Sequence, residues 1–243
     1  MFTTRLSTIA ILLSLCVAAS ACQSGSSPDA SKTPTDQADE GTTSESQPAT
    51  TSATAVKTEG QPLAEPAPKG MEVATFAGGC FWCMEGPFEK VDGVQAAISG
   101  YTGGPEEHPT YKQVSSGSTG HTEAVRVIYD PNVVTYDVLL DVFWKSMDPT
   151  DAGGQFADRG SQYRPAIFVH TEAQRELAKK SKATLDSSGR FDKPIIVPIE
   201  DASDFWVAED YHQDYYKTNA ERYMRYRIGS GRQGFLDKVW GDK

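Results

Sequence analysis

The chain is poor in cysteine, with only four among 243 residues. They are Cys16, Cys22, Cys80 and Cys83, and none follows in the remaining two thirds of the sequence. A structural zinc site usually needs four ligands, and no second cysteine pair is available to complete one. A zinc domain is therefore not expected.

The sequence also lacks an excess of positive charge and a long apolar run. Acidic residues outnumber basic ones by 33 to 23, and the formal net charge is −10. Nucleic-acid binding needs a basic surface, so this class of function is not expected. The apolar run at residues 9–17 is shorter than the roughly 20 residues that span a bilayer as a helix.

Residues 1–21 have the features of a secretory signal peptide: Arg5, the apolar run, and then small residues. The Ala-Ser-Ala sequence before Cys22 resembles the lipobox of bacterial lipoproteins, although alanine stands where leucine is more usual. This resemblance implies an exported protein whose acylated Cys22 anchors it to a membrane of the cell envelope, facing the periplasm. The alternative is ordinary leader cleavage that leaves Cys22 as a free thiol.

Residues 22–70 are rich in Ser, Thr, Pro, Ala and acidic residues and contain almost no large apolar side chain. Such a segment cannot bury enough surface to offset the entropy lost on ordering. It is predicted to be a disordered tether, which leaves residues 71–243 as one folded domain.

The folded domain alternates between strand and helix patterns. Strands are expected at residues 72–77, 94–101, 122–129, 164–170 and 195–199, with helices at 81–90, 135–147 and 171–187, followed by an aromatic, largely helical tail. This order predicts an α+β fold, a two-layer α/β sandwich of ferredoxin-like type with helices packed on one side of a mixed sheet. A monomer is expected.

The strand at residues 122–129 has one clearly apolar face, on which Glu123 lies. A carboxyl held against apolar neighbours can stay protonated near neutral pH, but a strand-end carboxylate exposed to water is as consistent with the pattern. Arg126 occupies the other face and is expected to point outward or lie at an edge. Residues 148–163 form a long polar loop, in which Asp158 and Tyr163 either line a site or belong to turns and surface.

Cys80 is expected at the junction between the first strand and the first helix, after Gly78 and Gly79. A helix N-terminus carries partial positive charge that stabilises a thiolate. Cys83 follows one turn later on the same helix face. This arrangement suits a nucleophilic thiol with a resolving thiol, whereas a purely structural disulfide across so short a loop would restrain the unfolded chain very little.

Six motifs extend across the folded domain in sequence order. They are GCFWCMEGPFEKVDGV at 79–94, GYTGG at 100–104, PTYKQV at 109–114, GHTEAVRVIYDP at 120–131, DRGSQYRPAI at 158–167 and AEDYHQDY at 208–215. Together they resemble the A-type peptide methionine sulfoxide reductases. The tail contains no cysteine, so the resemblance is to the subgroup whose resolving thiol lies three residues after the nucleophile.

The resemblance implies a peptide-methionine (S)-S-oxide reductase that acts on free or protein-bound methionine sulfoxide and needs no bound cofactor or metal. An external thioredoxin-like dithiol would recycle a disulfide between the two cysteines. The resemblance implies that Cys80 is the nucleophile, Cys83 the resolving thiol and Glu123 the proton donor. It implies that Tyr111 and Tyr163 bind the sulfoxide oxygen and that Phe81 and Trp82 form the pocket for the methyl group. Asp158 would contact substrate and water.

Several alternatives remain open from the residues alone. The CFWC segment also permits a general thiol–disulfide oxidoreductase or a non-catalytic domain with a structural disulfide. Phe81 and Trp82 could be core residues. His121 and His212 are interpreted as structural histidines.

Overall fold

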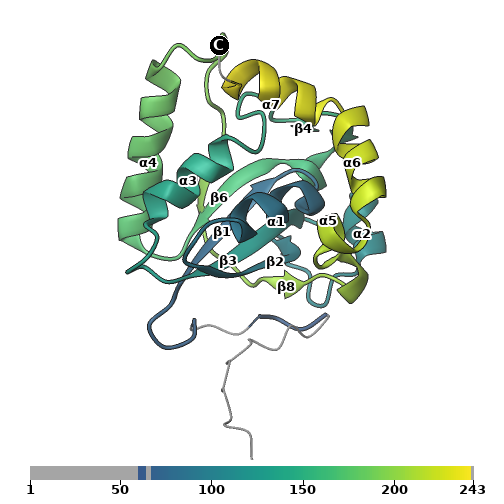
Figure 1. Cartoon of the computed structure of the whole chain (residues 1–243). Helices are drawn as coiled ribbons and strands as arrows, with labels where there is room; N and C mark the ends of the chain where they lie inside the picture. The colour runs from purple at the N-terminus through teal and green to yellow at the C-terminus, as the bar shows by residue number, and fades with distance from the viewer. Residues whose placement is uncertain (1–59, 64–66, 242–243) are drawn as a thin grey trace, which may run out of the picture. The chain divides into compact units, whose positions relative to one another are not determined.

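The computed structural model describes residues 60–63 and 67–241, shown in Figure 1. The expected signal peptide, Cys22 and most of the expected tether lie outside the described residues. Residues 60–63 nevertheless belong to the folded part, because the amides of Gly60 and Leu63 donate to the carbonyls of Val207 (3.1 Å) and Phe205 (2.8 Å). The tether was predicted to end at residue 70, and this boundary is therefore placed too late in the sequence.

Strands and helices alternate along the domain, and several shorter elements lie between them. In chain order they are β1 (Glu72–Gly78), α1 (Phe81–Glu89), β2 (Val94–Thr102), α2 (Tyr111–Ser115), β3 (Thr122–Tyr129), α3 (Tyr136–Trp144), β4 (Gly154–Gln155), β5 (Asp158–Arg159), the 3₁₀ turn Ser161–Tyr163, β6 (Pro165–Val169), α4 (Glu172–Ser187), β7 (Ile199–Asp201), β8 (Trp206–Val207), the 3₁₀ turn Asp210–His212, α5 (Tyr215–Thr218), α6 (Ala220–Gly229) and α7 (Arg232–Trp240). Within the described residues, none of these helices has the length and apolar character that crossing a membrane would require.

The main sheet has six strands in the order β7-β6-β1-β3-β2-β8. All neighbouring pairs are antiparallel except β6 and β7, so the sheet is mixed. Its four central strands, with α1 and α3 as connections, have the arrangement expected for a ferredoxin-like β-α-β-β-α-β unit. The predicted α+β fold is confirmed.

Helices α1 and α3 cover one face of the sheet (Figure 1). The apolar stripe expected on the helix at 135–147 is buried in full, with Tyr136, Leu139, Leu140, Phe143, Trp144 and Met147 all in the main core. Phe76 of β1 stacks between Phe88 of α1 and Phe143 of α3, with ring centroids at 5.0 and 5.1 Å. This packing fixes the angle at which α1 leaves the sheet.

The opposite face of the sheet is covered by extended chain and not by water. Ala124 and Ile128 of β3 pack there with Phe205 and Leu63. Arg126 lies between them and is only 3% exposed, so the prediction that it points outward or lies at an edge is wrong. Its Nη1 donates to the Leu63 carbonyl at 3.0 Å, and its guanidinium lies 4.7 Å from the Phe205 ring centroid.

Two further expectations differ from the structure. The strand expected at 195–199 occurs instead at Ile199–Asp201, where it pairs in parallel with β6 at the sheet edge. Pro194 and Pro198 lack the amides that a ladder requires, which shifts pairing beyond them. Residues 148–163, expected to be a loop without regular structure, contain the β4–β5 ribbon and a 3₁₀ turn.

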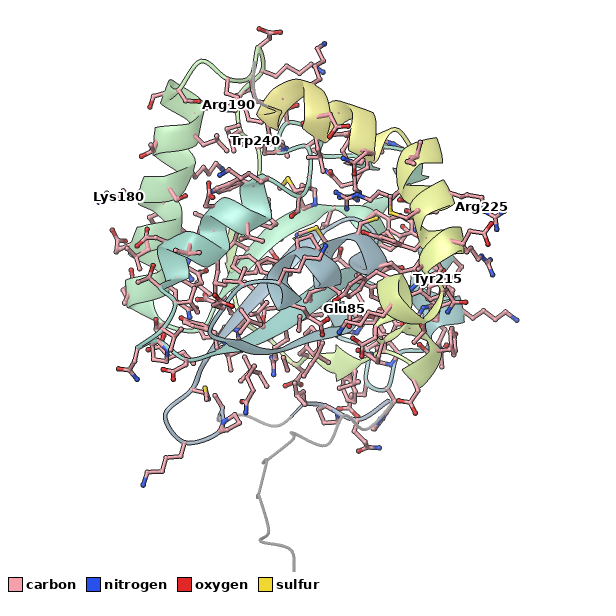
Figure 2. The ribbon with its side chains drawn as sticks, in the orientation of Figure 1. Glu85, Lys180, Arg190, Tyr215, Arg225 and Trp240 are labelled. Carbon is pink, nitrogen blue, oxygen red and sulfur yellow. The ribbon has the colours of Figure 1, made fainter. Side chains whose placement is uncertain are left out.

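The C-terminal helices pack against α1 at the end of the domain where the cysteines lie. Glu85 of α1 is fully buried and accepts hydrogen bonds from the Asp214 amide (3.0 Å) and the Ser99 hydroxyl (3.2 Å). Figure 2 shows Glu85 and Tyr215, the first residue of α5, on this side of the molecule. The carboxylate thus links α1 to the start of the tail.

Candidate active site

The turn between β1 and α1 positions Cys80 as predicted. Gly78 ends β1, and Cys80 is the N-cap residue of α1. Gly79 has φ = +82°, and a Cβ built on it would lie 2.5 Å from the Gln155 Cβ and 2.8 Å from Arg232 Nη2. Only glycine fits this conformation and this space, so the backbone approaches β4 and α7 closely.

Cys80 and Cys83 are both free thiols, one helical turn apart. Cys80 is 7% exposed and Cys83 is fully buried. Cys83 packs against Tyr215 and Tyr223 of the C-terminal helices. Cys80 is therefore the thiol that retains some access to solvent, and the tail encloses the second one.

The expectation of an unusually acidic Cys80 is wrong for this reduced state. Burial raises the pKa of the Cys80 thiol well above its ordinary value, and its hydrogen bond to Cys83 raises that pKa further. The Phe81 amide, the first of α1, donates to Glu123 Oε2 at 3.0 Å and not to the sulfur. The first amide of the helix is thus bonded to the Glu123 carboxyl group, and desolvation is the main influence on the pKa of the Cys80 thiol.

Cys83 is the more acidic member of the pair. The hydrogen bond from Cys80 lowers the pKa of Cys83 to about 7 against the opposing effect of burial, and nearby Arg232 and Arg227 lower it too. At neutral pH the pair is therefore partly ionised, and the negative charge lies mainly on the Cys83 sulfur. The sequence predicted that charge on Cys80 instead.

Glu123 lies on the apolar side of β3, as predicted, and is only 1% exposed. Burial raises its pKa to about 8, although the hydrogen bond from the Phe81 amide opposes the shift. A neutral carboxyl can donate a proton near neutral pH, which a water-exposed glutamate cannot do. The choice left open by the sequence is settled in favour of a buried acid.

Tyr111 and Tyr163 are both half-buried, and the ionised forms of Glu123 and Cys80 would each raise the pKa values of both tyrosines. Burial raises the pKa of Tyr111 to about 12 and that of Tyr163 further. Both hydroxyls therefore remain protonated donors at any physiological pH. The structure brings them to the same site as the cysteines.

Asp158 also lies at this site, on β5, and is part-buried. Burial raises its pKa. The Tyr226 hydroxyl of α6 donates a hydrogen bond to Asp158 Oδ2 and also interacts with the Cys80 thiol. Tyr226 was not among the predicted site residues.

Phe81 and Trp82 differ in exposure. Phe81 is 1% exposed and contacts His212, whereas Trp82 is part-buried. The Trp82 ring stacks on Tyr215, with centroids 3.8 Å apart, and its Nε1 donates to His212 Nδ1 at 3.1 Å. Trp82 is thus held at the opening of the site, while Phe81 forms part of its buried wall.

Both histidines interpreted as structural make the expected kind of contact. His121 is fully buried and interacts with the Gly104 amide and the Glu106 carbonyl. Burial lowers the pKa of His212 to about 4, so its ring is neutral and orients Trp82. Each imidazole therefore serves to hold neighbouring groups in place.

An acidic group outside the site comprises Glu85, Glu89 and Asp214, whose oxygens approach within 4.8 Å of one another. The Lys217 ammonium lies 2.6 Å from Glu89 and 2.8 Å from Asp214. A protein cation therefore already pairs with two of the three acids that could hold a metal ion. A hollow of about 770 Å³ between Asp192, Lys238 and Trp240 is lined by none of the predicted site residues.

Two residues of the site, Tyr226 and Arg232, were not predicted, and the tail supplies both. Arg232 is fully buried, and its Nη2 donates to the Gly78 carbonyl at 3.1 Å. The tail motif RYMRYRIGSGRQG shows many basic and aromatic residues at helical spacing, and nothing in that spacing separates these two from their exposed neighbours. Only the path of α6 and α7 past α1 distinguishes them.

A buried acid, a thiol pair and two protonated tyrosines define a redox site built on a ferredoxin-like sheet. The family model for peptide methionine sulfoxide reductase matches residues 72–243, and the chain belongs to this family. It is an oxidoreductase that reduces methionine sulfoxide.

Individual relatives agree with this assignment. Peptide methionine sulfoxide reductase MsrA of Bacillus velezensis is 55% identical over 172 residues, 71% of this chain and 97% of the relative. The MsrA of Listeria monocytogenes has the same identity over the same shares. Among solved structures, Saccharomyces cerevisiae Mxr1 in reduced form has a TM-score of 0.58 at 34% identity, covering 65% of this chain and 90% of that one. Methionine sulfoxide reductase A of Corynebacterium diphtheriae has a TM-score of 0.57 at 30% identity, covering 70% and 90%.

Proposed function

We propose that Cys80 attacks the sulfur of methionine sulfoxide while Glu123 protonates the sulfoxide oxygen. The observation that supports this most directly is the neutral, fully buried Glu123 carboxyl, which hydrogen-bonds to the amide next to the nucleophile. Protonation makes the sulfoxide sulfur electrophilic, and the Tyr111 and Tyr163 hydroxyls stabilise the charge that develops on oxygen.

In the first step, the Cys80 proton passes to the Cys83 thiolate as the Cys80 sulfur attacks. The attack forms a bond between the Cys80 sulfur and the substrate sulfur. The oxygen, protonated by Glu123, then transfers from the substrate sulfur to Cys80 as the substrate S–O bond and the new S–S bond both break, so that Cys80 becomes a sulfenic acid and methionine leaves. Glu123 is then a carboxylate, and Cys83 is a thiol. The negative charge has moved from sulfur to Glu123, so charge and atoms balance.

In the second step, Cys83 passes its proton to Glu123 and attacks the Cys80 sulfenic sulfur. An S–S bond forms, the S–O bond breaks, and the oxygen leaves as water with the proton from Glu123. The short separation of the two thiols, already joined by a hydrogen bond, supports Cys83 as the resolving residue. An external thioredoxin-like dithiol then restores both thiols by exchange.

We further propose that Phe81 and Trp82 form the surface that receives the substrate methyl group and that Asp158 contacts substrate through its free oxygen. The part-buried Trp82 beside the fully buried Phe81 supports this arrangement. The substrate class is methionine sulfoxide, in proteins or in free form, and the activity is protein repair after oxidative damage.

Intact mass provides the decisive experiment. One equivalent of a methyl sulfoxide peptide should release one methionine per enzyme and leave a protein lighter by two hydrogens, with a Cys80–Cys83 disulfide found by peptide mapping. A stable sulfenic acid in place of the disulfide would refute the role of Cys83. Failure of Cys80→Ser to abolish methionine formation would refute the nucleophile.

A general thiol–disulfide oxidoreductase remains the alternative function for a CFWC segment. The buried Glu123 carboxyl beside the thiols argues against it, because thiol–disulfide exchange breaks no S–O bond and needs no acid to protonate an oxygen. Insulin reduction measured beside sulfoxide reduction separates the two activities.

The N-terminal sequence supports an exported protein that is acylated at Cys22 and held at a membrane of the bacterial cell envelope by its lipid alone. Mass spectrometry of the membrane-extracted protein tests this directly. Acylation should be lost in Cys22→Ser, and that variant should be found in the soluble envelope fraction with its reductase activity intact.

A further inference from the structure

Arg232 carries a buried charge that the reaction described so far does not use. It is the first residue of α7, and its side chain is fully buried. Taking a guanidinium out of water is costly unless its charge and its donors find partners. A buried arginine in the tail of the domain therefore requires an explanation.

The hydrogen-bond partners of Arg232 are neutral. Nη1 donates to the Ser146 carbonyl at 2.6 Å and Nη2 to the Gly78 carbonyl at 3.1 Å, while Nε has no hydrogen-bond partner among the described residues. The Phe156 ring centroid lies 4.8 Å from the guanidinium carbon. Across residues 60–63 and 67–241, no carboxylate forms an ion pair with it, so the guanidinium charge has no formal counter-ion in direct contact.

The guanidinium is fixed against the turn that carries the nucleophile. Gly78 precedes Cys80 by two residues, and a Cβ on Gly79 would lie 2.8 Å from Nη2. The two carbonyl bonds connect α7 to the end of β1 and to the segment after α3. The charge therefore cannot swing away from the thiols as a flexible surface side chain could.

We propose that the Arg232 guanidinium is the fixed positive charge that stabilises the anionic form of the Cys80–Cys83 pair. The inference rests on the proposed use of these two thiols as a reacting pair. Arg232 is a positioning residue in this scheme, since it acts through the sulfurs and holds the Gly78–Gly79 backbone beneath them.

The ionisable groups around Cys83 come from every element packed on it. They are Cys80 before α1, Glu123 on β3, Asp158 on β5, Tyr215 on α5, Tyr223, Tyr226 and Arg227 on α6, and Arg232 on α7. Of the two cations, Arg227 is part-exposed and already engaged with Gln233 and Tyr223, whereas Arg232 is enclosed. An enclosed charge is screened least by water and salt.

The Arg232 charge should affect mainly the second step of the reaction, in which the disulfide forms. Cys83 must give up its proton to Glu123 before it can attack the Cys80 sulfenic sulfur, and that transfer creates a thiolate in a buried place. Arg232 lowers the cost of this thiolate. Formation of the disulfide should therefore depend on Arg232 more strongly than release of the first methionine does.

The test titrates Cys83 alone, in a background in which Cys16, Cys22 and Cys80 are all replaced by Ser, by the ultraviolet absorbance of the thiolate. Arg232→Met removes the charge and should move the titration midpoint upward by about 1 to 3 pH units, the range for one close opposite charge. Arg232→Lys keeps a cation and should restore most of the original midpoint. The matched control is Arg126→Met, which removes a buried arginine from the opposite face of the sheet and should leave the titration unchanged.

An unchanged Cys83 titration in a folded Arg232→Met protein overturns the proposal. If that variant does not fold, the salt dependence of the titration in the protein that keeps only Cys83 decides. If an enclosed charge stabilises the Cys83 thiolate, the titration midpoint should change little between low and high salt. A large change in the midpoint would mean that surface cations stabilise the thiolate, and it would overturn the proposal.

Single-turnover kinetics separate this inference from the proposed function. With both cysteines present, Arg232→Met should slow disulfide formation at neutral pH about tenfold for each pH unit by which the Cys83 midpoint rises, and the rate profile should move to higher pH. A higher midpoint with unchanged disulfide kinetics would retain the electrostatic role but refute Cys83 as resolving thiol. An unchanged titration with slowed kinetics would refute the electrostatic role alone.

Discussion

At the scale of single residues, the local environment favours opposite protonation states for two neighbouring groups, Glu123 and Cys83. Burial raises the pKa of Glu123, so this carboxyl keeps its proton, whereas Cys83 accepts a hydrogen bond and lies near two arginines, so it loses its proton more readily. The site therefore holds a proton donor and a proton acceptor at the same pH. Separation of pKa values by environment is a common way to assign acid and base roles.

The Glu123 carboxyl makes both stability and activity depend on pH. Its pKa is about 8 in the folded chain against an ordinary 4.5, so the folded state binds this proton more tightly. The corresponding stability is fully present below about pH 4.5 and is lost as pH rises through about 8. Glu123→Gln mimics the neutral acid, and thermal melts should show a smaller loss of stability than wild type between about pH 6 and about pH 9.

The same substitution removes the proton donor. We expect the rate of sulfoxide reduction to fall by about 10² to 10⁴, the usual contribution of a positioned acid. Wild-type activity should decline as pH rises through about 8, and the residual activity of Glu123→Gln should not show that decline. A wild-type rate in the variant at neutral pH would contradict the role of Glu123.

Cys83→Ser tests the second thiol at the residue scale. The variant should release about one methionine per enzyme and then stop when a dithiol protein is the reductant, because the sulfenic acid cannot condense. Quenched-flow counting of methionine measures this. Sustained turnover at the wild-type rate would mean that another group resolves the sulfenic acid.

At the scale of elements, the site depends on a turn that distant elements enclose. The Gly78–Gly79 turn is packed by Gln155 of β4 and Arg232 of α7, and it opens α1 at Cys80. These contacts join the first strand of the domain to its last helix. The position of the nucleophile is therefore set by parts of the chain that are far apart in sequence.

Gly79→Ala should disrupt this turn. The positive φ costs about 1–2 kcal/mol for a residue with a Cβ, and the clash with Gln155 adds to it, so activity should fall together with stability. Gly189→Ala is the matched control, since Gly189 has φ = +67° with nothing within 4 Å of the added Cβ. The control should lose similar backbone stability but keep its kcat, as chemical denaturation and steady-state assays can show.

At the scale of the whole domain, the sheet is buried on both faces although helices cover only one. Residues 60–63 and the segment around Phe205 cover the other face and provide the carbonyl that binds Arg126. Without Leu63, a buried arginine would lose a hydrogen-bond acceptor and an apolar cover. The N-terminal boundary of the stable unit is therefore earlier than the matched family region suggests.

Two truncations test that boundary. A chain starting at residue 60 should have the melting temperature of the longer chain, whereas one starting at residue 67 should be less stable by about 1–3 kcal/mol, because Arg126 loses a buried partner. Reductase activity at low temperature should persist in both. Equal stability of the two chains would show that residues 60–63 contribute nothing to the fold.

Much of the architecture could be predicted because local patterns determine it. The alternation in residues 122–129 and the apolar stripe from Tyr136 to Met147 each require one buried face, whatever the rest of the chain does. Glycines before a cysteine at a strand end likewise predict the turn at Cys80. The motif order predicted the family, which the comparisons confirm.

The tertiary structure alone decided the charges of the site and the cover of the second sheet face. Arg126 and Arg232 look like surface residues in sequence, because arginine usually is, and only the packing of distant segments buries them. The acidity of Cys80 was overestimated for the same reason, since desolvation depends on everything that surrounds a group in space. Periodicity is a local property of the chain, whereas the electrostatic environment is a property of the folded whole.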